Sequence, residues 1–288
     1  MSRIAVVTGG NKGIGFAIVK GLCREFDGVV YLTSRNEDRG RAAVEELKKD
    51  GFNPRFHQLD ITDDSSVERF RKYLKDTHGG LDVLVNNCGI SFQFDAPETF
   101  PQRVKETLRV NYFSLLRICE ALFPLLRPHS RVVQVSSSLG HLCKIKGAEL
   151  KARLASPELT EKELTQMMRD FVDAAEKNTH REAGWPNSSY TVSKVGVSAL
   201  SRIQQSAFDK DRREDIVVNA VHPGSVITDM SGKLGSMTPE RGAQAPLYLA
   251  LLPKYTEIKG QYVWHDNTVI DWVNGEVKTL RPDSPNLY

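Results

Sequence analysis

The 288-residue sequence lacks the features that direct a chain to membranes, to nucleic acid or to an oxidising compartment. Its four cysteines include no C-x-x-C pair, so we expect neither a disulfide framework nor a zinc site, and the reducing cytoplasm is the simplest location. No apolar run reaches the roughly 18 residues of a membrane span. A net charge of +3 supplies no basic stripe for nucleic acid. We therefore expect no nucleic-acid or membrane partner.

The sequence contains no internal repeat or low-complexity tract, and we expect no secretory signal. A strand pattern starts at Ile4, which leaves no room for the charged and apolar regions of a signal peptide. The remaining composition, 40% hydrophobic and 26% charged residues, is ordinary for a globular protein. We expect one catalytic, ligand-binding domain over residues 1–288.

Strand and helix patterns alternate along the chain, which predicts an α/β fold. The expected architecture is a Rossmann-type doubly wound parallel sheet of about seven strands with helices on both faces. The predicted strands are residues 4–8, 29–33, 55–59, 81–85, 131–135, 215–221 and 260–264. The predicted helices include residues 104–126, a helix capped by Asp63 or Asp64 that ends near His78, and one that carries Tyr190 to about Asp209.

One long segment, between Leu139 and Ser189, interrupts this alternation and contains no strand pattern. Residues 157–172 have the spacing of an amphipathic helix. Because connections of about fifty residues usually carry structure of their own, we expect residues from about 140 to 188 to form a helical insertion packed against the same domain.

A glycine-rich turn, Gly9-x-x-x-Gly13-x-Gly15, joins the first predicted strand to a helix that begins near Phe16. Glycines allow a sharp turn and a close approach to a pyrophosphate, and the helix start offers free N–H groups. The spacing differs from the common G-x-G-x-x-G, and a plain tight turn is the alternative. Its position directly after the first strand favours a dinucleotide cradle.

Ser34 and Arg35 follow the second predicted strand, where an NAD site carries an acidic residue for the ribose hydroxyl. A guanidinium can grip a 2′-phosphate through two parallel hydrogen bonds. Lys12, in the glycine turn, can add a second positive charge. We therefore predict NADP(H) rather than NAD(H), although the two residues could also be ordinary solvated cations.

Tyr190 and Lys194 are four residues apart in a segment with helical spacing, which places both side chains on one face. A phenol ordinarily loses its proton near pH ~10, and a fixed ammonium beside it lowers that pKa. Such a pair can exchange a proton near neutral pH, as carbonyl reduction requires. An isolated pair of this kind is more often a half-buried tyrosine with a solvated lysine.

Polar clusters follow several predicted strands, where a doubly wound sheet binds its ligands. These residues and the Tyr-Lys pair together resemble the signature set of the short-chain dehydrogenases/reductases, in the family's order. The matching segments are Thr8-Gly9-x-x-x-Gly13-x-Gly15, Asn87-Cys88-Gly89, Ser137, Tyr190-x-x-x-Lys194 and Pro223-Gly224. Cys88 stands where the family usually has alanine.

Within that family the sequence resembles the monomeric NADPH-dependent carbonyl reductases. The shared segments are Thr8–Gly15, Arg55–Ile61, Gly80–Asn87, Gly184–Pro186 and a long insertion between Ser137 and Tyr190. The resemblance implies that the insertion covers the helix face through which many relatives dimerise, so that this chain is a monomer.

The resemblance implies four catalytic residues. Tyr190 would protonate the carbonyl oxygen, Ser137 would polarise it, and Lys194 would lower the pKa of Tyr190 and bind the nicotinamide ribose. Asn111 would position Lys194 and a proton-relay water, although by itself it could be a helix-surface residue. Ser136 is the alternative to Ser137, and a run of serines can also merely satisfy turn hydrogen bonds.

The cofactor implied is NADPH/NADP+. Asp60 and Ile61 would lie along the adenine, Asn87 along the adenosine ribose, and Thr228 at the nicotinamide carboxamide. The remaining residues expected to bind the cofactor are Gly9, Asn11, Lys12, Gly13, Ile14, Gly15, Arg35, Gly89, Tyr190, Lys194, Pro223, Gly224 and Val226.

The expected substrate is a small carbonyl compound that contacts Ser137 and Tyr190. Ser225 stands where related carbonyl reductases carry a tryptophan, which would widen the pocket, and Trp185 could supply a replacement wall or simply be core. His222 could be an extra acid, but a role in supporting the backbone is the simpler expectation. The alternatives are oxidation of a specific steroid or alcohol, and a non-enzymatic sensor that binds NADP.

Overall fold

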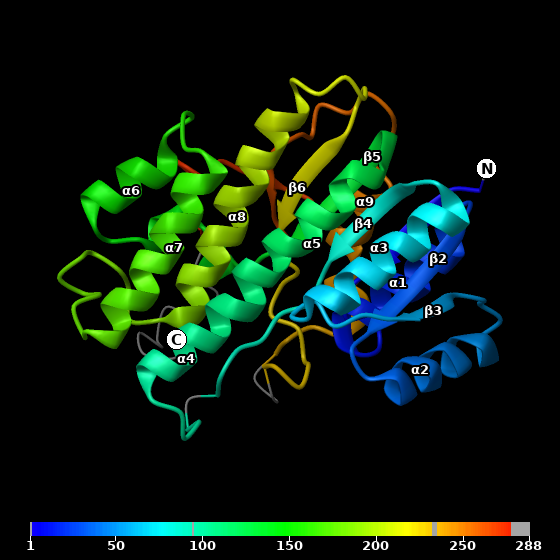
Figure 1. Ribbon diagram of the computed structural model, residues 1–288, viewed down its shortest axis with the longest axis horizontal. Helices are drawn as coiled ribbons and strands as arrows, with labels where there is room; N and C mark the ends of the chain where they lie inside the picture. Colours follow the sequence, from blue (N-terminus) through cyan, green and yellow to red (C-terminus); the bar gives the residue numbers. More distant parts are fainter. Residues whose placement is uncertain (1, 94, 232–234, 278–288) are drawn as a thin grey trace.

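The computed structural model describes residues 2–93, 95–231 and 235–277. Its single eight-stranded sheet has the order β3-β2-β1-β4-β5-β6-β7-β8 (Figure 1). The strands are β1 (Ile4–Val7), β2 (Val29–Ser34), β3 (Arg55–Gln58), β4 (Leu81–Asn86), β5 (Leu126–Val135), β6 (Val217–Val221), β7 (Tyr262–Val263) and β8 (Val269–Ile270). All neighbouring pairs are parallel except β7 with β8. This order confirms the predicted doubly wound sheet.

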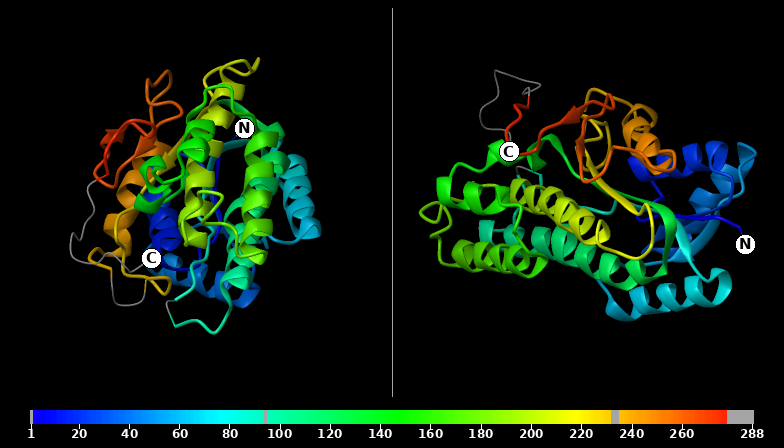
Figure 2. Two further views of the ribbon diagram at one scale, coloured as in Figure 1. Left: turned by 90° about the vertical axis from the view of Figure 1, so that its left-hand side faces the viewer. Right: turned by 90° about the horizontal axis from the view of Figure 1, so that it is seen from above.

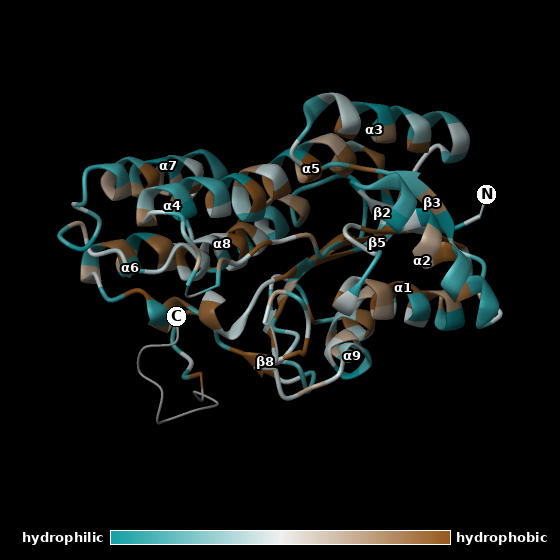
Figure 3. Ribbon diagram, turned by 90° about the horizontal axis from the view of Figure 1, so that it is seen from below, coloured by the Kyte–Doolittle hydropathy of each residue, from teal (hydrophilic) through white to brown (hydrophobic). Residues whose placement is uncertain are grey.

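Helices connect the strands on both faces of the sheet, as Figure 3 shows for α1 and α9 on one side and α3 and α5 on the other. The helices are α1 (Gly13–Glu25), α2 (Glu37–Lys49), α3 (Asp64–His78), α4 (Phe100–Leu108), a π-helical turn (Arg109–Phe113), α5 (Ser114–Leu122), α6 (Ala148–Ala155), α7 (Glu161–Glu176), α8 (Ser189–Phe208) and α9 (Pro239–Ala250).

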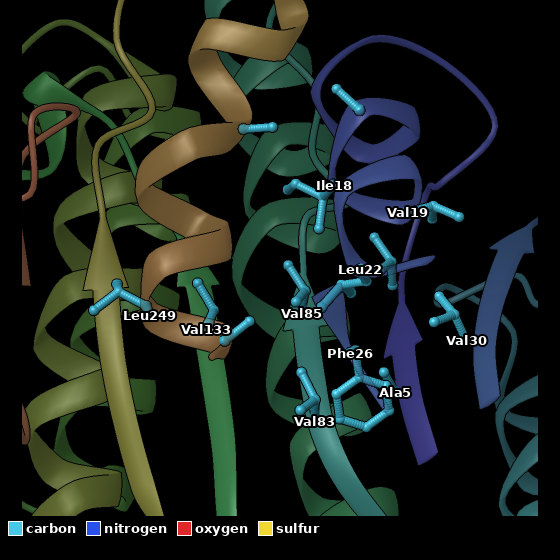
Figure 4. Packing of buried hydrophobic residues seen from close by; sticks show 14 of the residues in the cluster. Ala5, Ile18, Val19, Leu22, Phe26, Val30, Val83, Val85, Val133 and Leu249 are labelled. Carbon is cyan, nitrogen blue, oxygen red and sulfur yellow. The ribbon is translucent and has the colours of Figure 1, made fainter. Parts of the chain in front are cut away.

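Alternation along the strands supplies the two main cores. In β1, Ala5 and Val7 pack with α1 and α9, whereas Ile4 and Val6 pack with α3 and α5. Figure 4 shows the first of these cores, where side chains of α1 such as Leu22 meet strand residues. Because both faces of the parallel sheet are covered, its central strands β1, β4 and β6 are buried along their whole length and mostly apolar.

The segment between β5 and α8 forms two helices, α6 and α7, which lie at the end of the molecule away from the N-terminus (Figures 1 and 2). Helix α7 packs on α8 where Gly196 leaves room: a Cβ there would be 2.9 Å from the sulfur of Met168. The hydroxyls of Tyr112 and Thr165 are 3.1 Å apart and join α7 to the π-helical turn.

The boundaries of several elements differ from the prediction for identifiable reasons. The helix predicted from Pro157 begins at Glu161, because Thr160 and Glu163 form a capping box in which each side chain binds the other's backbone N–H. The sixth strand begins at Val217, because Asp215 has a φ of 58°. The helix predicted over 104–126 starts at Phe100 and is interrupted by the π-helical turn.

The eighth strand was not predicted. With two residues each, β7 and β8 are too short for an alternating pattern, and their pairing depends on the turn between them. The seventh predicted strand, residues 260–264, is therefore reduced to Tyr262–Val263.

Candidate active site

The glycine turn lies at the carboxyl end of β1, beside the point where the strand order reverses between β1 and β4. Gly9 and Gly13 have φ values of 66° and 56°, which disfavour any side chain. A Cβ on Gly15 would lie only 2.3 Å from the carbonyl oxygen of Gly9. The turn is therefore a bare backbone surface at a helix start, with the shape that a pyrophosphate requires.

The end of β4 holds this turn in place. Nδ2 of Asn87 donates to the carbonyl oxygens of Thr8 and Gly9 at 3.0 and 3.2 Å, and the hydroxyl oxygen of Thr8 accepts from the N–H groups of Asn87 and Cys88. Burial raises the pKa of the Cys88 thiol to about 11, so the thiol is neutral. Asn87 thus supports the cradle, and its expected contact with the ribose stays a prediction.

Positive charge gathers at one side of the turn. Arg35, directly after β2, is exposed and has no ion-pair partner among residues 2–93, 95–231 and 235–277. Lys12 is also exposed, but its Nζ is 2.5 Å from Oδ2 of Asp229. Asp60 uses Oδ1 to accept from the backbone and hydroxyl of Thr62, which shapes the turn after β3.

Helix α8 presents Tyr190 and Lys194 from its first turns, because Ser188 caps the helix by accepting the N–H of Thr191. Nζ of Lys194 lies 5.7 Å from the ring centroid of Tyr190 and donates to the carbonyl oxygen of Val135 at 2.8 Å. Lys194 is 4% exposed, and this burial lowers its pKa to about 8 despite the opposing effect of Cys88. The amine is therefore anchored between α8 and β5.

Asn111 occupies the centre of the π-helical turn, a local widening that often marks functional sites. Its Oδ1 accepts from the N–H of Ile90, and its Nδ2 donates to the carbonyl oxygen of Ile90 and to the hydroxyl of Ser193. A Cβ on Gly89 would lie 3.3 Å from Oδ1 of Asn111 and 3.5 Å from Nζ of Lys194. Asn111, Gly89 and Lys194 thus lie close together, and the roles expected for them stay predictions.

The three serines after β5 differ in their contacts. The hydroxyl of Ser136 is buried, 2.7 Å from that of Ser198 and donating to the carbonyl oxygen of Lys194, so it joins β5 to α8. Ser137 is partly exposed, and its hydroxyl oxygen accepts the N–H of Leu139 at 3.2 Å, which leaves its own proton to donate. These contacts favour Ser137 over Ser136 as the residue that meets a substrate.

The segment after β6 closes the far side of the site. Gly224 has a φ of 93°, and the side chain of Thr228 lies over the glycine turn, 3.3 Å from a Cβ position on Gly13. Val226 is 4% exposed and its side chain packs against Gly242 of α9, so its expected contact with the cofactor stays a prediction. Ser225 is partly exposed.

The structure distinguishes between the alternatives left open for two aromatic residues. Trp185 is 4% exposed and packs with Phe171 of α7, with ring centroids 5.3 Å apart, so it belongs to the core and not to a pocket wall. His222 is buried, and its Nδ1 accepts the N–H of Ser138, so it supports the backbone as expected.

Tyr262, whose hydroxyl donates to the carbonyl oxygen of Ser137, was not recognised in the sequence because 125 residues separate the two.

Within the ranges that the structure describes, no cluster of three or more histidine, cysteine or carboxylate side chains is arranged to hold a metal ion. No helix in the same ranges is long and apolar enough to cross a bilayer. The site therefore consists of a dinucleotide cradle at β1 and β2 and a phenol–amine–hydroxyl group between α8 and β5.

A doubly wound sheet with such a cradle and such a group of side chains defines a dinucleotide-dependent oxidoreductase. The family model described as short chain dehydrogenase matches residues 3–149. The chain belongs to the short-chain dehydrogenase family, as its sequence motifs indicated.

Curated relatives match nearly the whole chain. Carbonyl reductase (NADPH) 3 of Mus musculus is 47% identical, over 94% of this chain and 99% of its own length. Carbonyl reductase (NADPH) 1 of Homo sapiens is 46% identical, over 91% of this chain and 95% of its own. Among solved structures, salutaridine reductase from Papaver somniferum covers 90% of this chain and 99% of its own, with a TM-score of 0.82 and 32% identity.

Proposed function

We propose that this protein is an NADPH-dependent carbonyl reductase that converts aldehydes, ketones or quinones to alcohols. The observation that carries the proposal is the placement of Tyr190 and Lys194 side by side on α8, at the carboxyl edge of the sheet that holds the glycine cradle. The similarity to the NADPH carbonyl reductases of mouse and human supports the same activity.

The residues at this edge fit NADPH. Gly9, Gly13 and Gly15 form a cradle from which side chains are excluded, and the start of α1 lies beside it. Arg35 is an exposed cation without an ion-pair partner in the described part of the chain, as a 2′-phosphate site needs. Thr228 lies over the same cradle. When bound, NADPH supplies the hydride, which no side chain can provide.

The side chains around the carbonyl group supply the proton and its orientation. Tyr190 gives its phenolic proton to the carbonyl oxygen, and the Lys194 ammonium stabilises the phenolate that remains. Ser137 donates a hydrogen bond to the same oxygen, which polarises the carbonyl group. Asn111 acts through others, because its amide holds Ile90 and Ser193 and so fixes the floor of the site.

The proposal extends to the architecture of the protein. We propose one catalytic domain over residues 1–288, with a helical insertion from about 140 to 188; the helices α6 and α7 within that segment support this. Because α7 packs on α4 and α8, it occupies a face that a second subunit would need, which supports a monomer. Cys23, Cys88, Cys119 and Cys143 are free thiols, which suits the cytoplasm.

The test is NADPH oxidation by the purified protein with a panel of quinones, aldehydes and ketones. We expect turnover with several of them, a strong preference over NADH, and transfer of deuterium from labelled nicotinamide to the former carbonyl carbon. Parallel assays with NADP+ and steroids or other alcohols test oxidation as the main activity. Binding of NADPH without turnover of any carbonyl would contradict the proposal and favour a sensor.

A further inference from the structure

One peptide group in the loop after β5 is held at both of its polar atoms by buried side chains. The hydroxyl of Tyr262 donates to the carbonyl oxygen of Ser137 at 2.5 Å, and the N–H of Ser138 donates to Nδ1 of His222 at 2.9 Å. The oxygen and the N–H belong to the same peptide bond and point in opposite directions. Because a peptide bond is planar, these two bonds together fix the orientation of its plane.

We propose that His222 and Tyr262 are positioning residues that aim the hydroxyl of Ser137 at the substrate carbonyl oxygen, an assignment that rests on the proposed function. The side chains of His222 and Tyr262 hold the plane of the peptide bond between Ser137 and Ser138, which is one of the two peptide planes that meet at the Cα of Ser137. A rotation of that plane swings the side chain away from the oxygen that Tyr190 protonates. Misplacement of a reacting group by about 1 Å can lower a rate about 10²-fold.

Both positioning residues are buried and are held by the sheet: Tyr262 lies in β7, and His222 follows directly after β6. His222 and Tyr262 are 3% and 2% exposed. The N–H of His222 donates to the carbonyl oxygen of Val263 at 2.8 Å, which joins the two strands. The ring of Trp264 packs against that of His222 with centroids 4.3 Å apart. The support for Ser137 is therefore rigid.

The loop after β5 is also held at Gly140 and His141, by residues that follow β8. Nε1 of Trp272 donates to the carbonyl oxygen of Gly140 at 2.7 Å, and Nε2 of His141 is 2.9 Å from the carbonyl oxygen of Asp271. The chain after β8 thus clamps residues 137–141 against α8. This arrangement gives the short β7–β8 hairpin a role in the site, although it contributes no reacting group.

The chemistry of His222 fits positioning and not proton donation. Since Nδ1 accepts an amide N–H, the ring proton is on Nε2, which is buried and has no hydrogen-bond partner among the described residues. Burial, together with the neighbouring His265, lowers the pKa of His222 to about 3. The ring stays neutral at ordinary pH, and we expect no titration of His222 in the pH profile of the reaction.

Three substitutions test His222. In His222→Asn the side-chain oxygen can occupy the position of Nδ1, in His222→Gln it reaches the position of Nε2 instead, and His222→Leu has no acceptor. We expect kcat for carbonyl reduction to fall by about 10- to 100-fold in H222L and H222Q, with KM for NADPH unchanged, and to recover in H222N. Equal kcat in all three and in wild type would overturn the proposal.

A double-mutant cycle separates positioning of Ser137 from a general effect on the fold. In a Ser137→Ala background, we expect His222→Leu and Tyr262→Phe to lower kcat no further. Tyr255→Phe, which removes an exposed hydroxyl bound to Glu214, is the matched control and should leave kcat unchanged. Equal losses with and without Ser137 would contradict the proposal, even if H222L folds poorly, because Y262F and H222Q test the same coupling. Wild-type protein without reductase activity would instead overturn the proposed function, and the positioning role with it.

Discussion

Polar side chains have opposite roles at the two ends of the parallel strands. We call these ends the amino edge, where the strands begin, and the carboxyl edge, where they end. At the amino edge, the side chains of Arg131 and Asp215 are 3% and 2% exposed and form an ion pair, with Nη2 of Arg131 3.0 Å from Oδ2 of Asp215. The carboxylate also accepts from His129 and from the N–H of Tyr255. At the carboxyl edge, Tyr190 and Ser137 remain partly exposed.

At the amino edge the polar groups stabilise the fold by bonding to one another, whereas at the carboxyl edge they remain open to a ligand. The guanidinium of Arg131 also donates to the carbonyl oxygens of Leu252 and Pro253, so its hydrogen-bonding capacity is largely used inside the protein. At the carboxyl edge, Arg35 has no ion-pair partner in the described ranges. Substitutions at one edge should therefore change stability, and those at the other edge should change catalysis.

The largest effect is expected from Tyr190→Phe, which removes the proposed proton donor and keeps the aromatic ring. Carbonyl reduction should fall by about 10²–10⁴-fold, whereas the melting temperature and the Kd of NADPH should change little. Steady-state kinetics, thermal unfolding and NADPH fluorescence measure the three quantities. Wild-type rates in this variant would remove Tyr190 from the mechanism.

The matching change at the amino edge is Asp215→Asn, which keeps a residue that tolerates the φ of 58° but leaves Arg131 unpaired. Breaking a buried ion pair in this way lowers the free energy of unfolding by about 3–5 kcal/mol. Denaturant unfolding measures the loss, and kcat of the folded fraction should not change. Asp76→Asn, at an exposed pair with Lys72, is the control and should have little effect.

The ion pair also predicts how stability depends on pH. Burial alone would raise the pKa of Asp215, but hydrogen bonds from Tyr255, Arg131 and His129 lower it below the ordinary carboxyl value. The stabilisation is therefore present above that ordinary value and is lost as pH falls through the pKa of the folded state. In D215N, this part of the acid sensitivity should be absent.

At the carboxyl edge, Arg35→Ala tests the preference for NADPH over NADH. Loss of charge-assisted hydrogen bonds to a 2′-phosphate should raise KM for NADPH about 10- to 100-fold, with a much smaller effect on NADH. Arg41→Ala, at an exposed cation that already pairs with Glu37, serves as the control. Equal effects of R35A on both cofactors would assign Arg35 to general electrostatics.

The pKa of the Lys194 amine leads us to expect that NADPH binding depends on pH. Burial lowers its pKa to about 8, so the amine is charged below that pH and neutral above it. Because the dinucleotide is an anion, the Kd of NADPH should rise as pH increases through about 8, by no more than about tenfold per pH unit for one proton. Fluorescence titrations at several pH values measure this. Lys194→Met should bind more weakly and without that dependence.

The smallest effect is expected from Asp229→Asn. This change frees Lys12 from the exposed ion pair, so that its ammonium is available to the cofactor phosphate. The Kd of NADPH should fall by no more than about fivefold, and the gain should shrink at high salt. A weaker affinity in this variant would show that Asp229 helps to hold Lys12 in its binding position.

Sequence periodicity predicted the fold class, because buried parallel strands and amphipathic helices carry their signals locally. The cradle and the Tyr190–Lys194 pair were predicted for the same reason: each lies within a few consecutive residues. The contact of Tyr262 with the loop after β5 was not predicted. Tyr262 meets Ser137 only through strand pairing, and nothing near either residue in the sequence indicates it. The sequence left Trp185 open between a pocket wall and the core, because its burial depends on α7, which packs against it.

The most direct test of the account is a crystal structure with NADP+ and a bound carbonyl compound. We predict that the phenolic oxygen of Tyr190 and the hydroxyl of Ser137 both lie about 2.6–3.2 Å from the same carbonyl oxygen, with Arg35 at the 2′-phosphate. A carbonyl oxygen bound elsewhere, or a Tyr190 phenol directed away from the nicotinamide, would contradict it.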